Sequence, residues 1–290
     1  MASFLSSPTF VSQTPDTPIS EFALRVLVEF EGGETHVIGT ATIIAGHLAI
    51  TARHVLEEII ERFGAAETRV HEFEVTRYAI RLYQIMPGPE YVIWNVLTAW
   101  PCIDTDIAIL HLRLHGYSGA TAPSSWCTPR IMVVPPKLGS AVVGFGYHSS
   151  VVTVTPTAEG YHLDLNDDPT ATTGKVEEVL PNGQSAGKFG FPCYRVNARF
   201  DGGMSGGPVI DETGSVCGII SGTIFQGNFD EEPISYVATL WPMLRTVISA
   251  NRGGAYVRDV KYPVIDLALD QIIHAEGLSE LVRREQRASC

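Results

Sequence analysis

The sequence predicts an all-β protein made of two antiparallel β-barrels. In residues 22–30 every second side chain, from Phe22 to Phe30, is large and apolar, which is the period of two of a strand with one strongly apolar face. Many further short apolar segments follow, separated by turn-forming residues, as in antiparallel barrels. A passage rich in Gly, Ser, Thr and Pro at residues 116–130 divides the chain into halves. Together these observations predict two barrels with a connection between them.

Each segment of the chain has a predicted place. The predicted organisation is a flexible N-terminal tail at 1–20, a first barrel at 21–115, a linker at 116–130, a second barrel at 131–248 and a helical extension at 249–290. Apolar residues at helical spacing after His54 predict a short helix that ends near Gly64. The other strands are predicted near residues 72–85, 91–99, 106–112, 131–134, 140–145, 151–155, 175–180, 194–200, 209–211, 216–221 and 234–239.

Composition limits the possible functions. A chain of 290 residues with 45% hydrophobic content can bury one large β unit or two small barrels. The formal net charge of -12 repels nucleic-acid phosphates and anionic membrane surfaces, and the basic residues are scattered. No run approaches the length needed to span a membrane. Neither nucleic-acid binding nor a membrane role is therefore expected.

The cysteines and the N-terminal residues bear on the cellular compartment. The five cysteines are widely spaced, without a Cys-x-x-Cys pair of the kind that binds zinc: Cys102, Cys127, Cys193, Cys217 and Cys290. We expect them to be free thiols in a reducing compartment. Residues 1–14 contain no basic residue and no sustained apolar core, so no signal peptide is predicted. A cytoplasmic location follows as the expectation.

One glycine-rich segment is suited to exposing a nucleophile. Residues 201–209 read Asp-Gly-Gly-Met-Ser-Gly-Gly-Pro-Val, with Ser205 placed among four glycines. An attacked carbonyl becomes an oxyanion, which is best held by two converging backbone N–H groups, and Gly203 and Ser205 would supply them. Taken alone, such a segment is also typical of an ordinary flexible turn between strands.

Two upstream motifs offer the partners that a serine nucleophile needs. A serine hydroxyl is activated by an imidazole, and a carboxylate fixes the tautomer of that imidazole and stabilises its charged form. His54 follows two apolar strand-like runs, where a strand gives way to the predicted helix. Asp106 stands at the mouth of an apolar strand, a position from which a buried carboxylate would reach a histidine.

The order His54, Asp106, Ser205 and the three local motifs resemble the chymotrypsin-like serine protease superfamily. The resemblance is closest to its bacterial trypsin-like branch, related to the HtrA-type protease domain, and extends from about residue 21 to residue 244. It implies two six-stranded barrels, with an active site in the cleft between them that contains these three catalytic residues and an oxyanion hole formed by the amides of Gly203 and Ser205. It also implies a serine endopeptidase for protein or peptide substrates, with no cofactor and no metal.

The same resemblance assigns residues to substrate binding. Ser221 would support Asp106, and Ser221, Gly222 and Thr223 would pair with the substrate backbone as an added strand. Ile234 opens a segment that resembles the strand closing the family's specificity pocket. Thr223 and Ile234 would leave room for small or medium apolar groups, so we expect an apolar side chain before the cleaved bond.

Charged residues near this pocket leave its preference open. Arg199 stands six residues before Ser205, a position that often forms the pocket floor in digestive relatives. Its charge would disfavour basic side chains if it pointed inward, whereas Asp230, Glu231 and Glu232 would favour them.

One departure from the family pattern concerns activation. Digestive members carry an acid immediately before the serine, which pairs with a newly cleaved N-terminal amine, whereas this chain has Met204. Activation by N-terminal insertion is therefore not expected. The site would be formed from the start or switched by a partner or substrate.

The C-terminal extension and three motifs complete the chain. Leu267, Ile272, Ile273, Leu278, Leu281 and Val282 would line one face of one or two short helices, which pack on the body or mediate self-association or contact with an activating partner. Residues 164–169 are interpreted as a solvated acidic turn rather than a calcium loop. His111 and His115 lack a third metal ligand, and residues 144–147 are interpreted as a strand end with a turn.

A second class of function remains open. The chain could be a latent or catalytically silent protease-like module that binds or regulates and needs a partner, because function depends on the site rather than on the fold.

Overall fold

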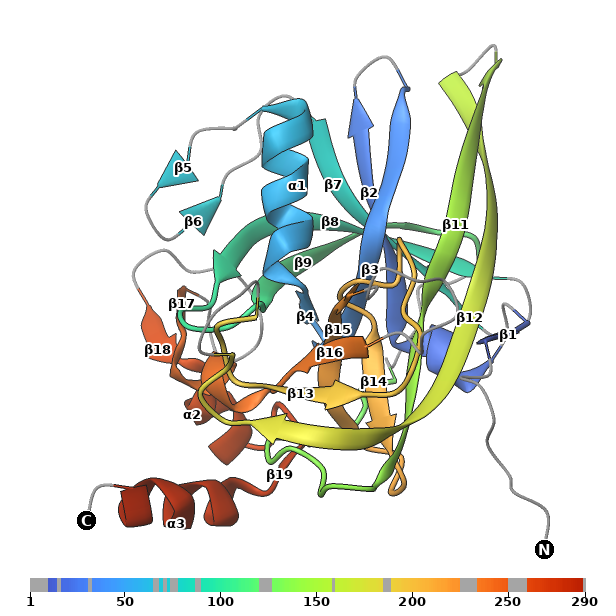
Figure 1. The fold of residues 1–290 in the computed structure, drawn as a ribbon. Helices are drawn as coiled ribbons and strands as arrows, with labels where there is room; N and C mark the ends of the chain where they lie inside the picture. The colour runs from blue at the N-terminus through green and yellow to red at the C-terminus, as the bar shows by residue number, and fades with distance from the viewer. Residues whose placement is uncertain are drawn as a thin grey trace, which may run out of the picture.

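The computed structural model describes residues 10–14, 17–30, 33–64, 68–69, 72–73, 78–86, 90–119, 127–157, 160–184, 189–224, 234–249 and 260–288. Most of them lie in strands, and helices are few (Figure 1). The first-half strands are β2 (Ala23–Phe30), β3 (Thr35–Ala45), β4 (Leu48–Thr51), β5 (Thr68–Arg69), β6 (Glu72–Phe73), β7 (Tyr78–Ile85), β8 (Tyr91–Pro101) and β9 (Ala108–Tyr117). The remaining strands are β1 (Phe10–Ser12), β10 (Ile131–Met132), β11 (Ala141–Thr157), β12 (Gly160–Leu180), β13 (Cys193–Val196), β14 (Pro208–Asp211), β15 (Val216–Ile224), β16 (Ile234–Ala238), β17 (Val247–Ser249), β18 (Lys261–Pro263) and β19 (Ala275–Glu276). The helices are η1 (Pro18–Glu21), α1 (Arg53–Phe63), η2 (Trp241–Arg245), α2 (Val264–Leu269) and α3 (Leu278–Ala288), of which η1 and η2 are 3₁₀ helices.

The second half contains a closed six-stranded barrel. Its strands follow the order β14-β11-β12-β13-β16-β15, and β14 also pairs with β15, which closes the ring. The pairs within the ring are antiparallel. The predicted mostly-β fold with a closed barrel is therefore confirmed.

The first half is an eight-stranded sheet in the order β5-β6-β8-β7-β2-β3-β4-β9, and β8 pairs with β9 as well as with β7. Helix α1 follows β4 and buries Val55, Leu56 and Ile59, which are the apolar positions that predicted it. It ends at Phe63, and Gly64 follows with φ +87°, as expected for a residue that terminates a helix.

A long β11–β12 hairpin corrects three predictions. Residues 164–169 lie inside β12, paired with β11 through Thr153 and Asp164, rather than in a solvated turn. Residues 144–147 lie inside β11 rather than at a strand end. Residues 10–12 form β1 on the edge of β12, where a flexible tail is predicted. The strand predicted at 151–155 lies in the outer part of β11, where residues 151–157 are exposed or half-buried.

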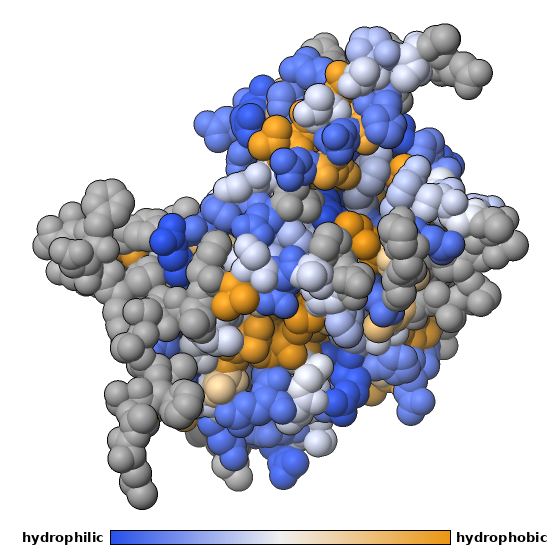
Figure 2. All heavy atoms as spheres, turned by 90° about the vertical axis from the view of Figure 1, so that its right-hand side faces the viewer, coloured by the Kyte–Doolittle hydropathy of each residue, from blue (hydrophilic) through white to orange (hydrophobic). Residues whose placement is uncertain are grey.

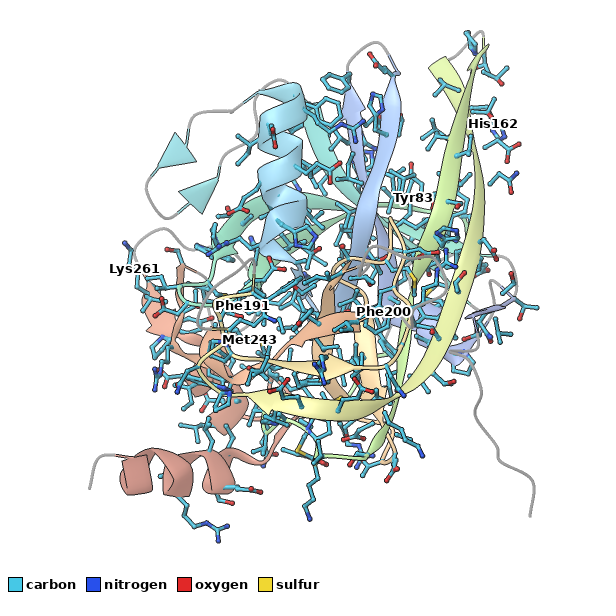
Figure 3. All side chains as sticks on the ribbon, in the orientation of Figure 1. Tyr83, His162, Phe191, Phe200, Met243 and Lys261 are labelled. Carbon is cyan, nitrogen blue, oxygen red and sulfur yellow. The ribbon has the colours of Figure 1, made fainter. Side chains whose placement is uncertain are left out.

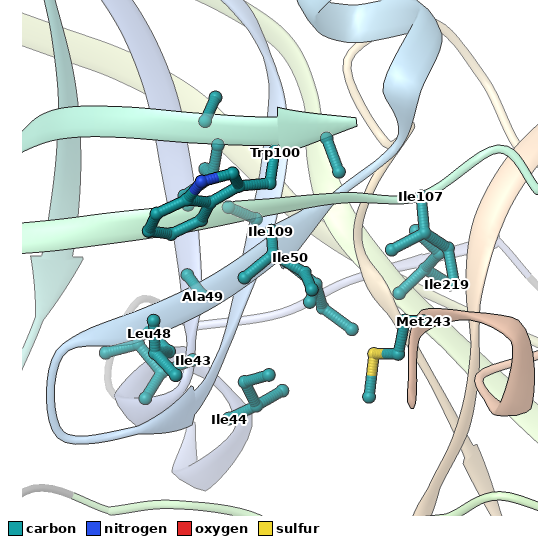
Figure 4. Close-up of a cluster of buried hydrophobic side chains, with 14 of the residues drawn as sticks. Ile43, Ile44, Leu48, Ala49, Ile50, Trp100, Ile107, Ile109, Ile219 and Met243 are labelled. Carbon is teal, nitrogen blue, oxygen red and sulfur yellow. The ribbon is translucent and has the colours of Figure 1, made fainter. Parts of the chain in front are cut away.

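The core extends through both halves and the C-terminal segment. Figure 4 shows Ile107 of the first half close to Ile219 of β15 and Met243 of η2. Leu267 of α2 and Ile273 belong to the same buried cluster. Strand β19 adds to this contact, because it pairs in parallel with β10. The predicted packing of the C-terminal segment on the body is therefore confirmed for these residues.

The hairpin and the first-half sheet face each other across a cavity of about 820 Å³. Tyr83 and His162, labelled in Figure 3, line it from β7 and β12. An ion pair with 3.0 Å between Arg81 Nε and Glu29 Oε2 lies in its wall. Figure 2 looks onto the side that carries the hairpin and shows polar side chains over most of it, with apolar ones gathered near the middle.

No helix in the described ranges is long and apolar enough to cross a bilayer. The four described cysteines are free thiols, as predicted, and Cys290 lies outside the described residues.

Thiol reactivity tests the burial of the cysteines. Burial raises the pKa of Cys102, Cys193 and Cys217 to about 12. Since only the thiolate reacts, about one molecule in 10⁴ carries a reactive form of each at pH 8, and the core also blocks access. We expect a thiol reagent at pH 8 to modify the exposed Cys127 of the native protein and to reach these three only after unfolding in guanidinium, as mapped by mass spectrometry.

A Cys290→Ser background removes the thiol outside the described residues. In this background, Cys127→Ser should eliminate all fast modification of the native protein by the thiol reagent. Rapid reaction of a second thiol in the native protein would contradict the burial.

Candidate active site

Asp106 lies at the centre of a hydrogen-bonded cluster that joins the two halves of the chain. Its buried carboxylate accepts the backbone N–H of His54 on Oδ1 at 3.0 Å, and Oδ2 lies 2.8 Å from His54 Nδ1. The hydroxyl of Ser221, on β15 in the second half, also donates to Oδ2. Hydrogen bonds to an ionised carboxylate are among the stronger ones in proteins, so donors from both halves fix its orientation.

The start of α1 holds His54. The first N–H groups of a helix lack acceptors within the helix, and Ala52 provides no side-chain cap here. Asp106 supplies acceptors for two of these N–H groups. Its backbone oxygen accepts the Arg53 amide at 3.2 Å, and its carboxylate accepts the His54 amide. Since a carboxylate only accepts, Nδ1 carries the ring proton and Nε2 of the neutral ring is free to act as a base.

Ser205 lies on the turn of residues 201–207, which leads into β14. Its carbonyl accepts the Thr40 amide at 2.9 Å, and a Cβ on the next residue, Gly206, would lie 2.8 Å from the backbone nitrogen of Ala52. The turn therefore packs against the strand end that leads into His54. Within the described ranges, no hydrogen bond joins Ser205 Oγ to the His54 ring. Catalytic hydrogen bonds often tighten only when a ligand is bound.

The turn packs too closely for side chains at three of its glycines. A Cβ would lie 2.3 Å from the Tyr147 oxygen at Gly203, 2.1 Å from the Thr40 oxygen at Gly206 and 2.0 Å from the Phe145 oxygen at Gly207. Gly203 and Gly206 also have positive φ, at +90° and +84°. The sequence interpretation, in which this segment exposes a nucleophile, misses this packing.

The backbone amides of Gly203 and Ser205 have no acceptor among the described residues, whereas the Met204 amide between them donates to the Asp201 oxygen at 3.2 Å and the Gly206 amide to the Ile220 oxygen at 2.8 Å. Two unused donors on one turn are suited to binding an anionic oxygen.

Met204 is fully buried, and its Cα would lie 2.6 Å from a Cβ on Gly146 of β11. An acid at this position would have to be buried with a partner. The methionine instead packs into the closed barrel of the second half, with Val209, Phe200 and Val142 in the same apolar cluster.

The predicted substrate-binding residues lie on neighbouring strands. Ser221, Gly222 and Thr223 belong to β15, and β16, which begins at Ile234, pairs with β15 on one edge. On the other edge, β15 is paired with β14 through residues 216–219 only, so the described structure has no strand beside residues 221–223 there.

Thr223 bridges β15 to the segment that precedes the serine turn. Its Oγ1 donates to the Phe200 oxygen at 2.8 Å, accepts the Phe200 amide at 3.3 Å and lies 2.7 Å from Ser235 Oγ. Phe200, labelled in Figure 3, is buried beneath β11, where its ring lies 2.3 Å from a Cβ placed on Gly144. This hydroxyl therefore occupies the space between the two segments.

Arg199 lies in a more exposed place than a pocket floor. Its side chain is 52% exposed, and its Nε donates to Asp201 Oδ1 at 2.7 Å. The neighbouring acid compensates its charge. Residues 230–232, predicted to favour basic side chains, lie outside the described residues.

The structure places the discounted metal motif on a strand. His111 is buried in β9 and His115 follows on the same strand. In the part of the chain that the structure describes, no group of three His, Cys, Asp or Glu side chains is arranged to hold a metal ion.

The packing of the turn makes a testable contrast between two glycines. Gly203 and Gly214 both have positive φ, at +90° and +79°, but a Cβ on Gly214 has no atom within 4 Å. We expect Gly214→Ala to lower the free energy of unfolding by about 1 kcal/mol through the backbone alone. Gly203→Ala should lower it by about 1–3 kcal/mol more, because the methyl group displaces the Tyr147 carbonyl. Urea unfolding followed by fluorescence measures both; equal losses would show that the turn is not tightly packed.

A comparison with models of protein families identifies the family. The family model described as a trypsin-like peptidase domain matches residues 39–219. No curated protein sequence matches the chain significantly.

Several solved protease structures are similar. The active form of the Rv3671c protease from M. tuberculosis is 19% identical, with 82% of this chain and 88% of that chain covered and a TM-score of 0.45. The MamO protease domain from Magnetospirillum magneticum is 14% identical, with 76% and 92% covered and a TM-score of 0.44. The HtrA-type protease AlgW with a tripeptide is 13% identical, with 76% and 56% covered and a TM-score of 0.43.

The family match covers both the segment that contains His54 and Asp106 and the segment that contains Ser205. The chain therefore belongs to the trypsin-like peptidase domain family.

Proposed function

We propose that the protein is a serine endopeptidase that hydrolyses peptide bonds through Ser205, His54 and Asp106. The observation that carries the proposal is the Asp106 cluster, in which a carboxylate oxygen lies 2.8 Å from His54 Nδ1, beside a serine turn with two unused amides. We also propose that the first-half sheet forms the second six-stranded barrel of the family's fold, with the active site between the two barrels.

In the proposed reaction, His54 Nε2 takes the proton of Ser205 Oγ as that oxygen bonds to the peptide carbonyl carbon. The amides of Gly203 and Ser205 stabilise the resulting oxyanion. His54 then gives the proton to the leaving amine as the carbon–nitrogen bond breaks, which leaves an acyl-enzyme. Water, deprotonated by the same histidine, attacks this ester and releases the acid product and Ser205.

The open edge of β15 supports a mode of substrate binding. An extended peptide that pairs with residues 221–223 would continue the barrel sheet by one strand and gain main-chain hydrogen bonds. We propose that this pairing brings the scissile carbonyl to the serine turn.

We further propose that the side chain before the cleaved bond is small. The Thr223 hydroxyl is bonded to Phe200 and Ser235, so its side chain fills the space between β15 and the segment before the turn. This narrows the earlier expectation of an apolar group to one about the size of alanine. Arg199, paired with Asp201, does not contribute an uncompensated charge.

Covalent labelling tests the nucleophile and also the alternative of a latent or silent module. A fluorophosphonate should label the wild-type protein and fail to label Ser205→Ala, because phosphonylation needs the activated Oγ. Intact-mass spectrometry measures the adduct. Ser140→Ala, which removes a hydroxyl away from the turn, should label at the wild-type rate. Equal labelling of Ser205→Ala and wild type would rule out the assignment; no labelling of a folded wild type would favour the silent module.

A peptide library tests the size of the side-chain pocket. We expect cleavage after alanine to exceed cleavage after leucine or phenylalanine in the wild type. Thr223→Gly should raise the kcat/KM for leucine relative to alanine by about 10-fold or more, because one or two methylene groups are worth that much in a pocket. Thr223→Ser retains the hydroxyl and should keep the preference for small residues. An unchanged leucine-to-alanine ratio in Thr223→Gly would refute the bridge as the size limit.

A further inference from the structure

Thr40, on β3 in the first half, makes two hydrogen bonds to the serine turn. Its backbone N–H donates to the Ser205 oxygen at 2.9 Å, and its Oγ1 donates to the Gly203 oxygen at 2.8 Å. The Tyr147 amide donates to the same Oγ1 at 3.2 Å, which leaves the hydroxyl proton directed at Gly203. The residue is fully buried, so no solvent competes for these bonds.

All four carbonyls of residues 202–205 have donors from the protein. His148 Nδ1 lies 3.3 Å from the Gly202 oxygen, Thr40 serves the Gly203 and Ser205 oxygens, and the Gly207 amide donates to the Met204 oxygen at 2.9 Å. Thr40 therefore supplies two of these four donors.

The donors determine where the unused amides point. A peptide group is planar, so an N–H points opposite to the carbonyl of the same group. The Gly203 and Ser205 amides belong to the groups whose carbonyls are held by His148 and Gly207. Thr40 holds the Gly203 and Ser205 carbonyls, which belong to the peptide groups directly after these two amides. This prevents the glycines, which rotate easily, from turning the amides away.

The residue before the serine is Met204, which is buried in an apolar cluster and has no charge that could hold the turn. The neutral hydroxyl of Thr40, from the opposite half, holds the turn instead. Sequence reasoning missed it because a threonine in an apolar strand is also an ordinary strand former.

We propose that Thr40 is a positioning residue that holds the oxyanion-binding turn in its active conformation from the first half of the chain. The proposal rests on the proposed serine endopeptidase function. It makes Thr40, through its hydroxyl on the Gly203 oxygen and its backbone N–H on the Ser205 oxygen, rather than a terminal amine and an acid, the residue that keeps the turn amides directed at the substrate carbonyl.

Three variants of the full-length protein test it. Thr40→Val keeps the shape but removes the hydroxyl, Thr40→Ser keeps the hydroxyl, and Thr239→Val removes an equally buried hydroxyl that donates to the Pro192 oxygen at 2.9 Å, away from the turn. The measurements are the second-order rate of fluorophosphonate labelling, kcat and KM for the best library peptide, and thermal unfolding, all at a temperature where every variant is folded.

We expect Thr40→Val to lower kcat and the labelling rate by about 10- to 100-fold, because a small misplacement of oxyanion donors costs that much, while KM changes by no more than about twofold. Thr40→Ser should stay within about threefold of the wild type, since it restores the bond to Gly203. Thr239→Val should match the wild type in both rates even if its unfolding temperature falls.

The outcomes separate this inference from the proposed function. Wild-type labelling that depends on Ser205, together with a Thr40→Val variant that reacts as fast as the wild type, overturns the role of Thr40 and leaves the peptidase standing. A loss in Thr40→Val that Thr40→Ser shares in full, or that Thr239→Val reproduces, also overturns it, because the effect then follows packing or stability. Failure of the folded wild type to label overturns the proposed function itself.

Discussion

The close packing of the serine turn between the two halves is the constraint on which the rest of the structure depends. Backbone carbonyls of Thr40, Phe145 and Tyr147 occupy the places where side chains would begin on three of the turn's glycines. Both halves contribute, since Thr40 lies on β3 and the other two on β11. A side chain at Gly206 would push the halves apart, and one at Gly203 or Gly207 would push the turn away from β11, so their identity follows from packing within the chain as well as from access for a substrate.

The Asp106 cluster makes the second connection between the halves. A carboxylate that caps α1, orients the imidazole and accepts from Ser221 ties the helix start of the first half to β15 of the second. Because Thr51 Oγ1 donates to the Thr40 oxygen at 2.7 Å, the strand end that leads to His54 is linked to the strand that holds the turn. His54 and the serine turn are therefore both held by these two strands, and a shift of the first half displaces both. Such pre-organisation lowers the reorganisation needed during a reaction.

The sequence predicted the parts of this arrangement that have local signals. The helix after His54 has apolar side chains at helical spacing, and the first strand has apolar side chains at every second position, so both appear where expected, at Arg53–Phe63 and Ala23–Phe30. Of the outer β11–β12 hairpin, the strand predicted at 151–155 is confirmed within β11, but residues 160–174 of β12 were missed because their Asp, Asn and Thr residues are typical of a turn; the order of this strand comes from pairing with β11. Thr40 and Thr223 were not recognised as bridges for a related reason: their partners lie 163 and 23 residues away in the sequence, and a hydroxyl gives no sign of its distant acceptor.

Apolar packing also holds the halves together, away from the serine turn. Ile107 of the first half, Ile219 of the barrel and Ile273 of the C-terminal segment belong to one buried cluster, and β19 pairs with β10 directly after Ile273. The C-terminal segment thus fills a core to which both halves contribute. The contacts in this core are apolar, whereas those at the turn are polar. Apolar contacts tolerate substitutions of similar volume, whereas the hydrogen bonds at the turn need particular atoms in particular places. The stability of the assembly and the geometry of the site are therefore set by different residues, which is why a hydroxyl such as that of Thr40 can govern the turn without governing the fold.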